Sequence, residues 1–411
     1  MIRKYSVIVL LGILVLLFLP INKVQTEGFV LEQDKDCIVV RSDDNKEHRF
    51  CGISADEGAI IHIDTYASLT SWISFHREKA SVNKPLNSSE QLLKRLNAMT
   101  IEQKLGQLLV VRTEENLAEP LNFTPGGYIL FANDFEGKNK EEIRKMISSL
   151  EGALVMVDEE GGKVVRVSSA LYEEGYPSAQ DLYHQGGWEA VERNMIEKSI
   201  ILVSLGIHVN LNPVVDVSMN PEDYIYPRAF GQNASMTAEY AALAVRIQNE
   251  HGLVSCLKHF PGYGGNKDTH EGFSVDAKAL DDYRNHDFLP FLSGIKAGSP
   301  MVMMSHVIME AVDPYLPASL SRSVHDLLRE ELNFEGIIIS DDLMMKAIQY
   351  QSRNPLCDAL RAGNDLLMTT DPAVSLNELI RAYESGELSM NQIDESVLKV
   401  LELKEKLGLL R

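Results

Sequence analysis

The sequence predicts an α/β protein in which residues 91–411 form a (β/α)8 barrel of the TIM type. Three observations support this fold class. Short apolar runs recur along the segment, helical stretches with a 3.6-residue period lie between or after most of them, and no G-x-G-x-x-G fingerprint follows the early runs. The last observation disfavours the alternative, an open doubly wound sheet. Alternation of this kind over a segment of this length is typical of a barrel.

The apolar runs are the expected strands of the barrel. They cover residues 107–111, 127–131, 153–157, 208–211, 253–257, 301–305, 336–340 and 365–368. The clearest helical stretches between them are 140–150, 236–251 and 376–385. We therefore expect an inner ring of parallel strands and an outer ring of helices.

Polar residues gather where the expected strands end. Five strands run into polar or ionisable residues, namely Asp158, the segment Asn212 to Asp216, Lys258 with His259, His306, and Asp341 with Asp342. A single carboxylate in such a place is explained as the cap of the next helix. Five polar strand ends are not explained by helix caps. In a barrel all five point to the face where active sites lie. The sequence therefore predicts an active site at this face.

The first 90 residues differ from the barrel segment. Arg3 and Lys4 precede an apolar run at 6–19, which is shorter than the roughly 20 residues of a spanning helix and is typical of a signal peptide. We divide the chain into a signal peptide or N-terminal membrane anchor (1–26), a small β-rich segment (27–80), a linker (81–90) and the barrel (91–411). We expect an exported protein, secreted or anchored at the outer face of the cytoplasmic membrane through residues 6–19.

Net charge and cysteine positions give two further expectations, on the class of partner and on disulfide bonding. The formal net charge of −20 argues against a nucleic-acid partner, because the phosphates would be repelled. Cys37 and Cys51 flank a short β-type segment and could form a disulfide in an exported protein. Cys256 lies in an apolar strand and Cys357 in a helical pattern, which indicates buried thiols.

One stretch, LKHFPGYGGNKDTHEG at 257–272, concentrates the chemistry. Asp268 and His270 lie two residues apart on it, and a carboxylate beside an imidazole produces an acid/base group that works near neutral pH. Asp341 follows an apolar strand, where an aspartate can act as a nucleophile. Asp342 is expected to point to the opposite side if the strand continues. Lys258 and Arg166 are candidates for binding hydroxyl or carboxylate groups of a ligand.

Metal binding is the competing interpretation of these residues. A site could be composed of His259, Asp268, His270 and His306. No H-E-x-x-H motif or regular histidine spacing supports it. Prolonged EDTA treatment tests it, since a metal-dependent activity would be lost.

The stretch KHFPGYGGNKDTHEG resembles the corresponding loop of glycoside hydrolase family 3, in its β-N-acetylhexosaminidase branch. Further blocks resemble the same family in order along residues 93–411. They are the helix containing Met99–Gln107, VDEEGGKVVRV (157–167), GIHVNLNPVVDV (206–217), PRAFG (227–231), GIIISDDLMMKAI (336–348) and the closing segment with AGNDLLM. Two departures are a loop one residue shorter before Asp268, and Lys163 in place of the usual arginine.

The resemblance implies a TIM-type barrel, retaining hydrolysis, and no metal or organic cofactor. By this resemblance Asp341 is the nucleophile, and His270, oriented by Asp268, is the acid/base group in place of the second carboxylate of most retaining enzymes. The positions implied to bind the sugar in subsite −1 are Asp158, Arg166, Arg228, Lys258 and His259.

The expected activity is that of an exo-β-N-acetylglucosaminidase. The implied substrate is a glycan or muropeptide with terminal β-linked N-acetylglucosamine, such as a peptidoglycan fragment, and export fits cell-wall turnover. Three alternatives remain open: a phosphorylase, a β-glucosidase, and a wall-sugar-binding protein without turnover. A histidine acid/base would not repel an anionic phosphate acceptor as a carboxylate does, which is the argument for the phosphorylase.

Overall fold

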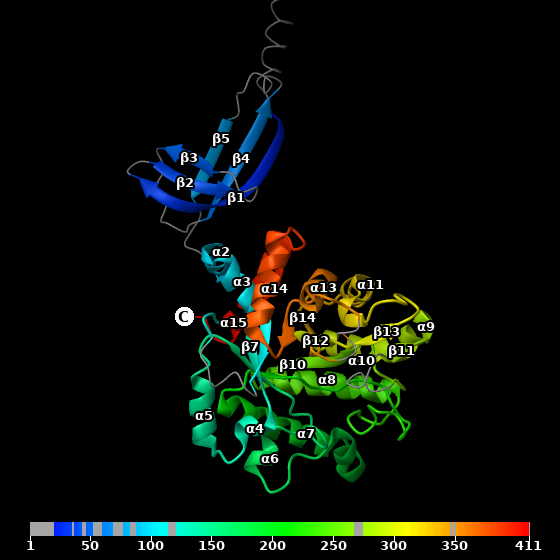
Figure 1. Ribbon diagram of the computed structural model, residues 1–411. Coiled ribbons are helices and arrows are strands. Elements are labelled where there is room, and N and C mark those ends of the chain that lie inside the picture. Colours follow the sequence, from blue (N-terminus) through cyan, green and yellow to red (C-terminus); the bar gives the residue numbers. More distant parts are fainter. Residues whose placement is uncertain are drawn as a thin grey trace, which may run out of the picture. The chain divides into compact units, whose positions relative to one another are not determined.

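The computed structural model describes residues 20–34, 37–42, 47–51, 60–68, 77–82, 88–113, 121–266, 274–345, 348 and 351–410 (Figure 1). The chain divides into two compact units between Ala98 and Met99. The predicted boundaries at 26, 80 and 90 remain predictions, and the apolar run at 6–19 lies outside the described residues. None of the helices in the described ranges is long and apolar enough to cross a membrane.

The first unit contains an antiparallel sheet with the strand order β3-β2-β1-β4-β5. Its strands are β1 (Pro20–Asp34), β2 (Cys37–Ser42), β3 (Glu47–Cys51), β4 (Ile60–Ser68) and β5 (Arg77–Val82), and helix α2 (Ser88–Ala98) follows. Strand β1 thus includes residues that the sequence division assigned to the N-terminal segment. Cys37 and Cys51 are register partners across β2 and β3. Their disulfide stays a prediction.

The second unit is built on a parallel sheet of eight strands. These strands are β6 (Leu109–Arg112), β7 (Gly127–Leu130), β8 (Leu154–Val157), β9 (Val209–Asn210), β10 (Val254–Phe260), β12 (Met301–Met304), β14 (Ile337–Ser340) and β15 (Leu367–Thr369). They follow one another around the sheet in chain order, and β15 pairs with β6. A parallel bridge between Ile339 and Leu366 joins β14 to the start of β15, so the sheet is nearly closed. The predicted α/β barrel is confirmed at this level, and each strand overlaps its predicted run.

Helices surround this sheet. They are α3 (Ile101–Gln107), α4 (Ala132–Phe135), α5 (Lys140–Ser148), α6 (Ser168–Leu171), α7 (Ala179–Leu205), α8 (Ala234–Glu250), α9 (Leu280–Asp282), α10 (Phe288–Lys296), α11 (Arg322–Asp326), α13 (Pro355–Ala362), α14 (Pro372–Glu384) and α15 (Met390–Lys406). Strands β11 (Ser274–Asp276) and β13 (Val307–Met309) form a small parallel pair beside the main sheet. The helices predicted at 140–150, 236–251 and 376–385 correspond to α5, α8 and α14.

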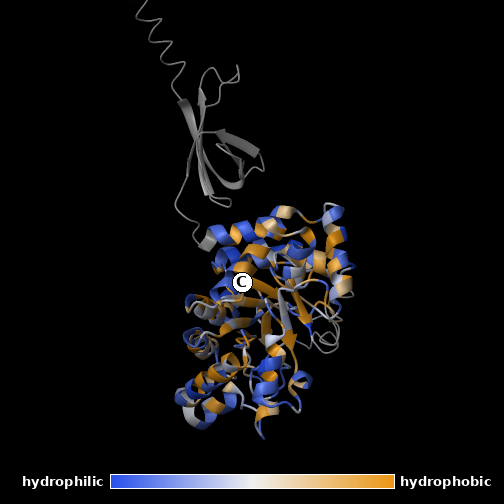
Figure 2. Ribbon diagram, turned by 90° about the vertical axis from the view of Figure 1, so that its left-hand side faces the viewer, coloured by the Kyte–Doolittle hydropathy of each residue, from blue (hydrophilic) through white to orange (hydrophobic). Residues whose placement is uncertain are grey.

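The core lies inside the ring of strands and between the strands and the helices. Figure 2 shows the strands mostly in the apolar colour and the surrounding helices in both colours. The inner cluster includes Val110, Met156, Cys256 and Ile339 from the strands, and Val400 from α15 joins it. Burying each such side chain stabilises the fold by about 1.5–3 kcal/mol. Cys256 and Cys357 are buried free thiols, as the sequence predicted.

Candidate active site

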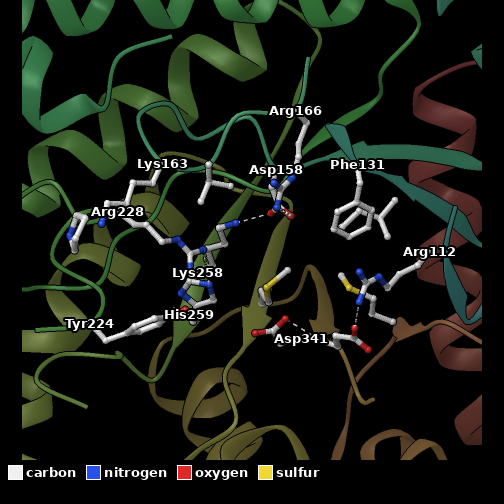
Figure 3. A pocket seen from close by; sticks show the side chains of 16 residues that line it. Arg112, Phe131, Asp158, Lys163, Arg166, Tyr224, Arg228, Lys258, His259 and Asp341 are labelled. Atoms are coloured by element: carbon white, nitrogen blue, oxygen red, sulfur yellow. Dashed lines mark hydrogen bonds and ion pairs between the residues drawn. The ribbon is translucent and has the colours of Figure 1, made fainter. Parts of the chain in front are cut away.

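A pocket of about 510 Å³ opens at the carboxyl ends of the barrel strands (Figure 3). It is lined by Arg112, Ile129, Phe131, Asp158, Lys163, Val164, Arg166, Tyr224, Pro227, Arg228, Lys258, His259, Met303, Asp341, Asp342 and Met368. Three of these, Ile129, Met303 and Met368, are almost fully buried and form an apolar base. A base of this kind with charged groups around it is typical of a small-molecule site.

Lys258 is the centre of the first charged cluster. It lies on β10, its side chain is 1% exposed, and its Nζ is 2.6 Å from both Asp158 Oδ1 and Glu160 Oε1. Burial alone would lower the pKa of Lys258, but the charges of Asp158 and Glu160 outweigh burial and raise this pKa. The two carboxylates therefore favour the charged form of Lys258.

Arg228 closes the same cluster from the other side of Glu160. Its Nε and Nη2 donate to the two oxygens of Glu160 at 2.9 and 2.7 Å, a bidentate pair. Burial would raise the pKa of Glu160, but Arg228 and Lys258 together hold it well below its usual range. Glu160 thus fixes both cations. We call Asp158, Glu160, Arg228 and Lys258 the β8–β10 cluster.

His259 is oriented by a buried carboxylate. Asp216, which is 1% exposed, lies 2.7 Å from His259 Nδ1 through its Oδ2 and also accepts hydrogen bonds from the backbone N–H groups of His259 and Tyr263. A carboxylate only accepts, so Nδ1 holds the hydrogen. The Nε2 atom then faces Arg228 Nη2 at 3.4 Å and can accept from it.

The segment that positions Arg166 is held by Glu159, a fully buried carboxylate. Glu159 Oε2 accepts from the backbone N–H groups of Arg166 and Val167 at 2.8 and 2.6 Å. Gly161 precedes this segment with φ +103°, and a Cβ there would lie 2.2 Å from the carbonyl oxygen of Pro177. The turn therefore needs glycine. It brings Arg166 Nη2 within 4.0 Å of Asp158 Oδ2.

Asp341 lies directly after β14 and faces the same pocket (Figure 3). The backbone N–H of Asp342 donates to Asp341 Oδ1 at 2.8 Å and so fixes the rotation of this carboxylate. Asp341 and Asp342 both line the pocket, and the condition under which Asp342 was expected to point to the opposite side, a continuing strand, is not met. The reason is that β14 ends at Ser340, so strand alternation does not extend to Asp341 and Asp342.

Six of the predicted site residues therefore lie around one pocket, namely Asp158, Arg166, Arg228, Lys258, His259 and Asp341. Asp268 and His270 lie outside the described residues. The stems on either side of them are joined, because Ser274 Oγ donates to Asn266 Oδ1 at 3.0 Å, and Asn266 Nδ2 donates to Asp276 Oδ2 at 2.9 Å.

The alternative metal set is not tested, because two of its four members, Asp268 and His270, lie outside the described residues. His306 is fully buried, its Nε2 lies 3.0 Å from the backbone oxygen of Asp342, and its Nδ1 lies 2.8 Å from Ser319 Oγ. No group of three metal-ligating side chains occurs among the described residues. His306 instead supports the turn that contains Asp341.

Several residues of the site were given no role by the sequence patterns, although Asp216 was placed at the predicted face. Glu160 and Asp216 orient the predicted cations and His259, while Arg112, Phe131 and Tyr224 line the pocket. Glu160 stands two residues after Asp158, and Arg112 ends an expected strand in the same way as Lys258. The strand-end rule that found the others thus contained a signal for Arg112.

Such an arrangement suits a ligand with several hydroxyl groups. Asp158 can accept hydrogen bonds, whereas Arg166, Arg228 and Lys258 can donate them. Asp341 stands across the pocket from these groups (Figure 3). A carboxylate across a pocket from groups that can bind hydroxyls is compatible with a sugar-processing enzyme.

Comparison with known proteins agrees with this class. Residues 100–403 match the model described as "Glycosyl hydrolase family 3 N terminal domain". The chain therefore belongs to glycosyl hydrolase family 3 and is a glycoside hydrolase.

Two relatives indicate the branch of the family to which the chain belongs. The chain is 32% identical over 280 residues to "Beta-hexosaminidase" of Stenotrophomonas maltophilia strain K279a, which covers 64% of this chain and 81% of that protein. It is 32% identical over 320 residues to "Beta-hexosaminidase LpqI" of Mycobacterium tuberculosis, covering 73% and 82% respectively. These matches confirm the resemblance to the β-N-acetylhexosaminidase branch.

A solved structure shows the same fold. The family 3 beta-N-acetylglucosaminidase from Paenibacillus sp. str. FPU-7 superposes with a TM-score of 0.71 and 30% identity. The match covers 76% of this chain and 63% of that protein, so the chain spans less than two thirds of its length.

Proposed function

We propose that this chain is a retaining exo-β-N-acetylglucosaminidase that hydrolyses terminal β-linked N-acetylglucosamine. One observation carries the proposal: the Asp341 carboxylate shares a single pocket with the β8–β10 cluster. The names of the relatives, beta-hexosaminidase and beta-N-acetylglucosaminidase, support the same sugar.

In the proposed reaction the β8–β10 cluster binds the sugar hydroxyls and Asp341 attacks the anomeric carbon. The backbone N–H of Asp342 orients this carboxylate by donating to Asp341 Oδ1. The bond from the anomeric carbon to the leaving oxygen breaks as the bond to Asp341 forms, and His270 donates the proton to the leaving oxygen. Water then hydrolyses the glycosyl ester with His270 as the base, which retains the configuration.

Fixed charges lower the barrier in this scheme. The transition state resembles an oxocarbenium ion, and the ionised Asp341 stabilises its positive charge. The cations of the β8–β10 cluster are held by Glu160 and Asp158 before substrate binds, so little reorganisation is needed during the reaction. Asp268 would orient His270 from the same loop.

Hydrolysis of 4-nitrophenyl β-N-acetylglucosaminide tests the activity. We expect release of nitrophenol, loss of at least about a thousandfold in Asp341→Asn, and a strong reduction in His270→Ala. Proton NMR at early times should show the β-anomer of the free sugar as the first product. Full activity of the Asp341 variant would contradict its assignment as the nucleophile. An α-anomer as the first product would contradict a retaining mechanism.

We further propose that the natural substrate is a peptidoglycan fragment with a non-reducing N-acetylglucosamine, and that the protein acts outside the cytoplasmic membrane. The apolar run at 6–19, preceded by Arg3 and Lys4, supports export. Fractionation of cells and a panel of muropeptides test this. Carrying out the reaction in phosphate and in phosphate-free buffer separates hydrolysis from phosphorolysis, whose product would be the sugar 1-phosphate.

A further inference from the structure

We propose that Arg112 is a positioning residue for the nucleophile, which it holds in place through Asp342. The proposal rests on the function proposed above, in which Asp341 attacks the sugar. Arg112 ends β6, and Asp342 follows β14. Strand β15 lies between these two strands in the nearly closed sheet, so the Arg112 side chain crosses the end of β15 to reach Asp342.

The contact between the two side chains is short and partly shielded. Arg112 Nη1 lies 2.6 Å from Asp342 Oδ2, and the side chains are 23% and 12% exposed. Arg112, Asp341 and Asp342 all line the pocket, and Figure 3 labels Arg112 and Asp341. Partial burial protects the pair from solvent screening, so it holds its geometry better than a surface ion pair.

Asp342 connects Arg112 to the nucleophile. Its Oδ1 accepts the backbone N–H of Met344 at 2.9 Å, its backbone oxygen lies 3.0 Å from His306 Nε2, and its backbone N–H donates to Asp341 Oδ1. The turn that carries Asp341 is thus held by β6 on one side and by His306 on the other. If Arg112 releases the Asp342 side chain, the N–H that orients Asp341 loses one of its supports.

Arg112 is itself held at the pocket by Phe131. The guanidinium carbon of Arg112 lies 4.5 Å from the centre of the Phe131 ring, and that of Arg166 lies 5.2 Å from the same centre. Phe131 is in turn fixed through its backbone N–H, which donates to Asp134 Oδ2 at 2.7 Å. The nucleophile turn is therefore connected through Phe131 to the side of the pocket where Arg166 approaches Asp158.

Charge gives a second reason for this arrangement. Asp341 and Asp342 are adjacent and both line the pocket, so two negative charges lie close together. Arg112 balances the charge of Asp342 and leaves Asp341 as the negative charge available to the sugar. Without Arg112, the Asp342 carboxylate loses its cationic partner beside the nucleophile and can turn into the space that the guanidinium occupied.

A double-mutant comparison tests the proposal on the full chain. We expect Arg112→Met to lower kcat about 10- to 100-fold with a change in KM below about threefold, because a misplaced nucleophile slows the bond-making step. Asp342→Asn keeps the backbone N–H and should cost less. Arg112→Met with Asp342→Asn should recover at least part of the lost kcat, because the uncompensated charge is gone. Arg112→Lys, which keeps the charge, should be intermediate.

The possible results separate the proposals. If Arg112→Met mainly raises KM, Arg112 contacts the substrate directly and the positioning role is overturned. A double variant that is no faster than Arg112→Met overturns it as well, since a purely structural defect would not be rescued by Asn at 342. Asp341→Asn is assayed in parallel: an active Asp341 variant refutes the proposed nucleophile itself, whereas an inactive one leaves the Arg112 result to decide the positioning role alone.

Discussion

Charged side chains are held in place on both sides of the pocket, but by different arrangements of partners. On one side the centre of the β8–β10 cluster is nearly sealed from solvent, with Lys258 and Glu160 side chains 1% and 3% exposed, while Asp158 and Arg228 at its edge are 17% and 19% exposed. On the other, the pair of Arg112 and Asp342 is 23% and 12% exposed. The first side is proposed to bind the sugar, and the second to present the nucleophile to it.

The difference lies in how many partners each charge has. Lys258 contacts two carboxylates, and Glu160 contacts two cations, so each charge is fixed by more than one neighbour. Removing one partner of a buried ion pair leaves an uncompensated charge and costs about 3–5 kcal/mol. Arg112 and Asp342 can regain water when one is removed. We therefore expect stability to depend on the β8–β10 cluster, and turnover on both sides.

The largest effect is expected for Lys258→Met. Asp158 and Glu160 would then face each other without the cation between them, so the variant should lose roughly 3–5 kcal/mol of stability and nearly all activity. Thermal unfolding and kcat/KM measure the two losses. Lys163→Met is the matched control, because Lys163 lines the same pocket with an exposed side chain. It should unfold within about 0.5 kcal/mol of the unchanged chain.

Glu160→Gln tests the same side of the pocket, the β8–β10 cluster. The amide keeps the shape of the side chain but removes the charge that holds Arg228 and Lys258, so we expect kcat/KM to fall by about a hundredfold or more. Asp342→Asn is the matched change on the other side, and its effect on unfolding should be smaller. Equal losses of stability in the two variants would contradict the difference between the two sides.

Asn266→Ala probes the stems of the loop that contains Asp268 and His270. Asn266 is 8% exposed and links Ser274 and Asp276 across the base of this loop. If His270 is the acid, losing this link should slow substrates with poor leaving groups about tenfold, and activated dinitrophenyl substrates much less. Rates measured over a series of aryl leaving groups decide this. A uniform loss for every leaving group would argue against a role in proton donation.

The smallest expected effect is on the pH dependence of stability. It concerns two buried lysines, Lys404 and Lys258. Lys404 donates to Gln107 Oε1 at 2.6 Å rather than to a carboxylate, and burial lowers the pKa of Lys404 to about 7. In the unfolded chain this pKa is near 10.5. Between these values the unfolded state binds the extra proton, so the free energy of unfolding contributed by Lys404 rises with pH from about 7 towards 10.5. Below pH 7 the full burial penalty remains.

Lys404→Met should remove this pH dependence. The difference in Tm between the unchanged chain and the variant is expected to shift in favour of the unchanged chain between pH 7 and pH 9. The pKa of Lys258 is raised instead, so its contribution is fully present below its unfolded value of 10.5 and is constant over this range. Parallel Tm curves for the unchanged chain and Lys404→Met would show that Lys404 stays charged.

The fold was predictable because its signals are local. Apolar runs and helical periods marked all eight strands, and polar residues after them marked Asp158, Lys258 and Asp341. Which side chains pair with one another was not predictable. The ion pair between Lys258 and Asp158 joins residues separated by 100 positions, and the pair of Arg112 and Asp342 joins residues 230 apart. Such pairs depend on the closure of the sheet, which no local pattern contains.

The side on which Asp342 lies shows the same limit at short range. Strand alternation assigns Asp341 and Asp342 to opposite faces, but it holds only while the strand continues. β14 ends at Ser340, so alternation does not extend to these two aspartates. Where a strand ends depends on hydrogen bonds to its neighbours, such as the one from the Asp341 N–H to the Met304 oxygen.

The most direct test of the account is to identify the residue that becomes glycosylated. A fluorinated N-acetylglucosamine derivative with a good leaving group accumulates the covalent intermediate, and peptide mass spectrometry locates the sugar. We predict one sugar per chain, attached to Asp341, and none in Asp341→Asn. A sugar on another residue, or a fully active Asp341→Asn variant without any adduct, would contradict the account.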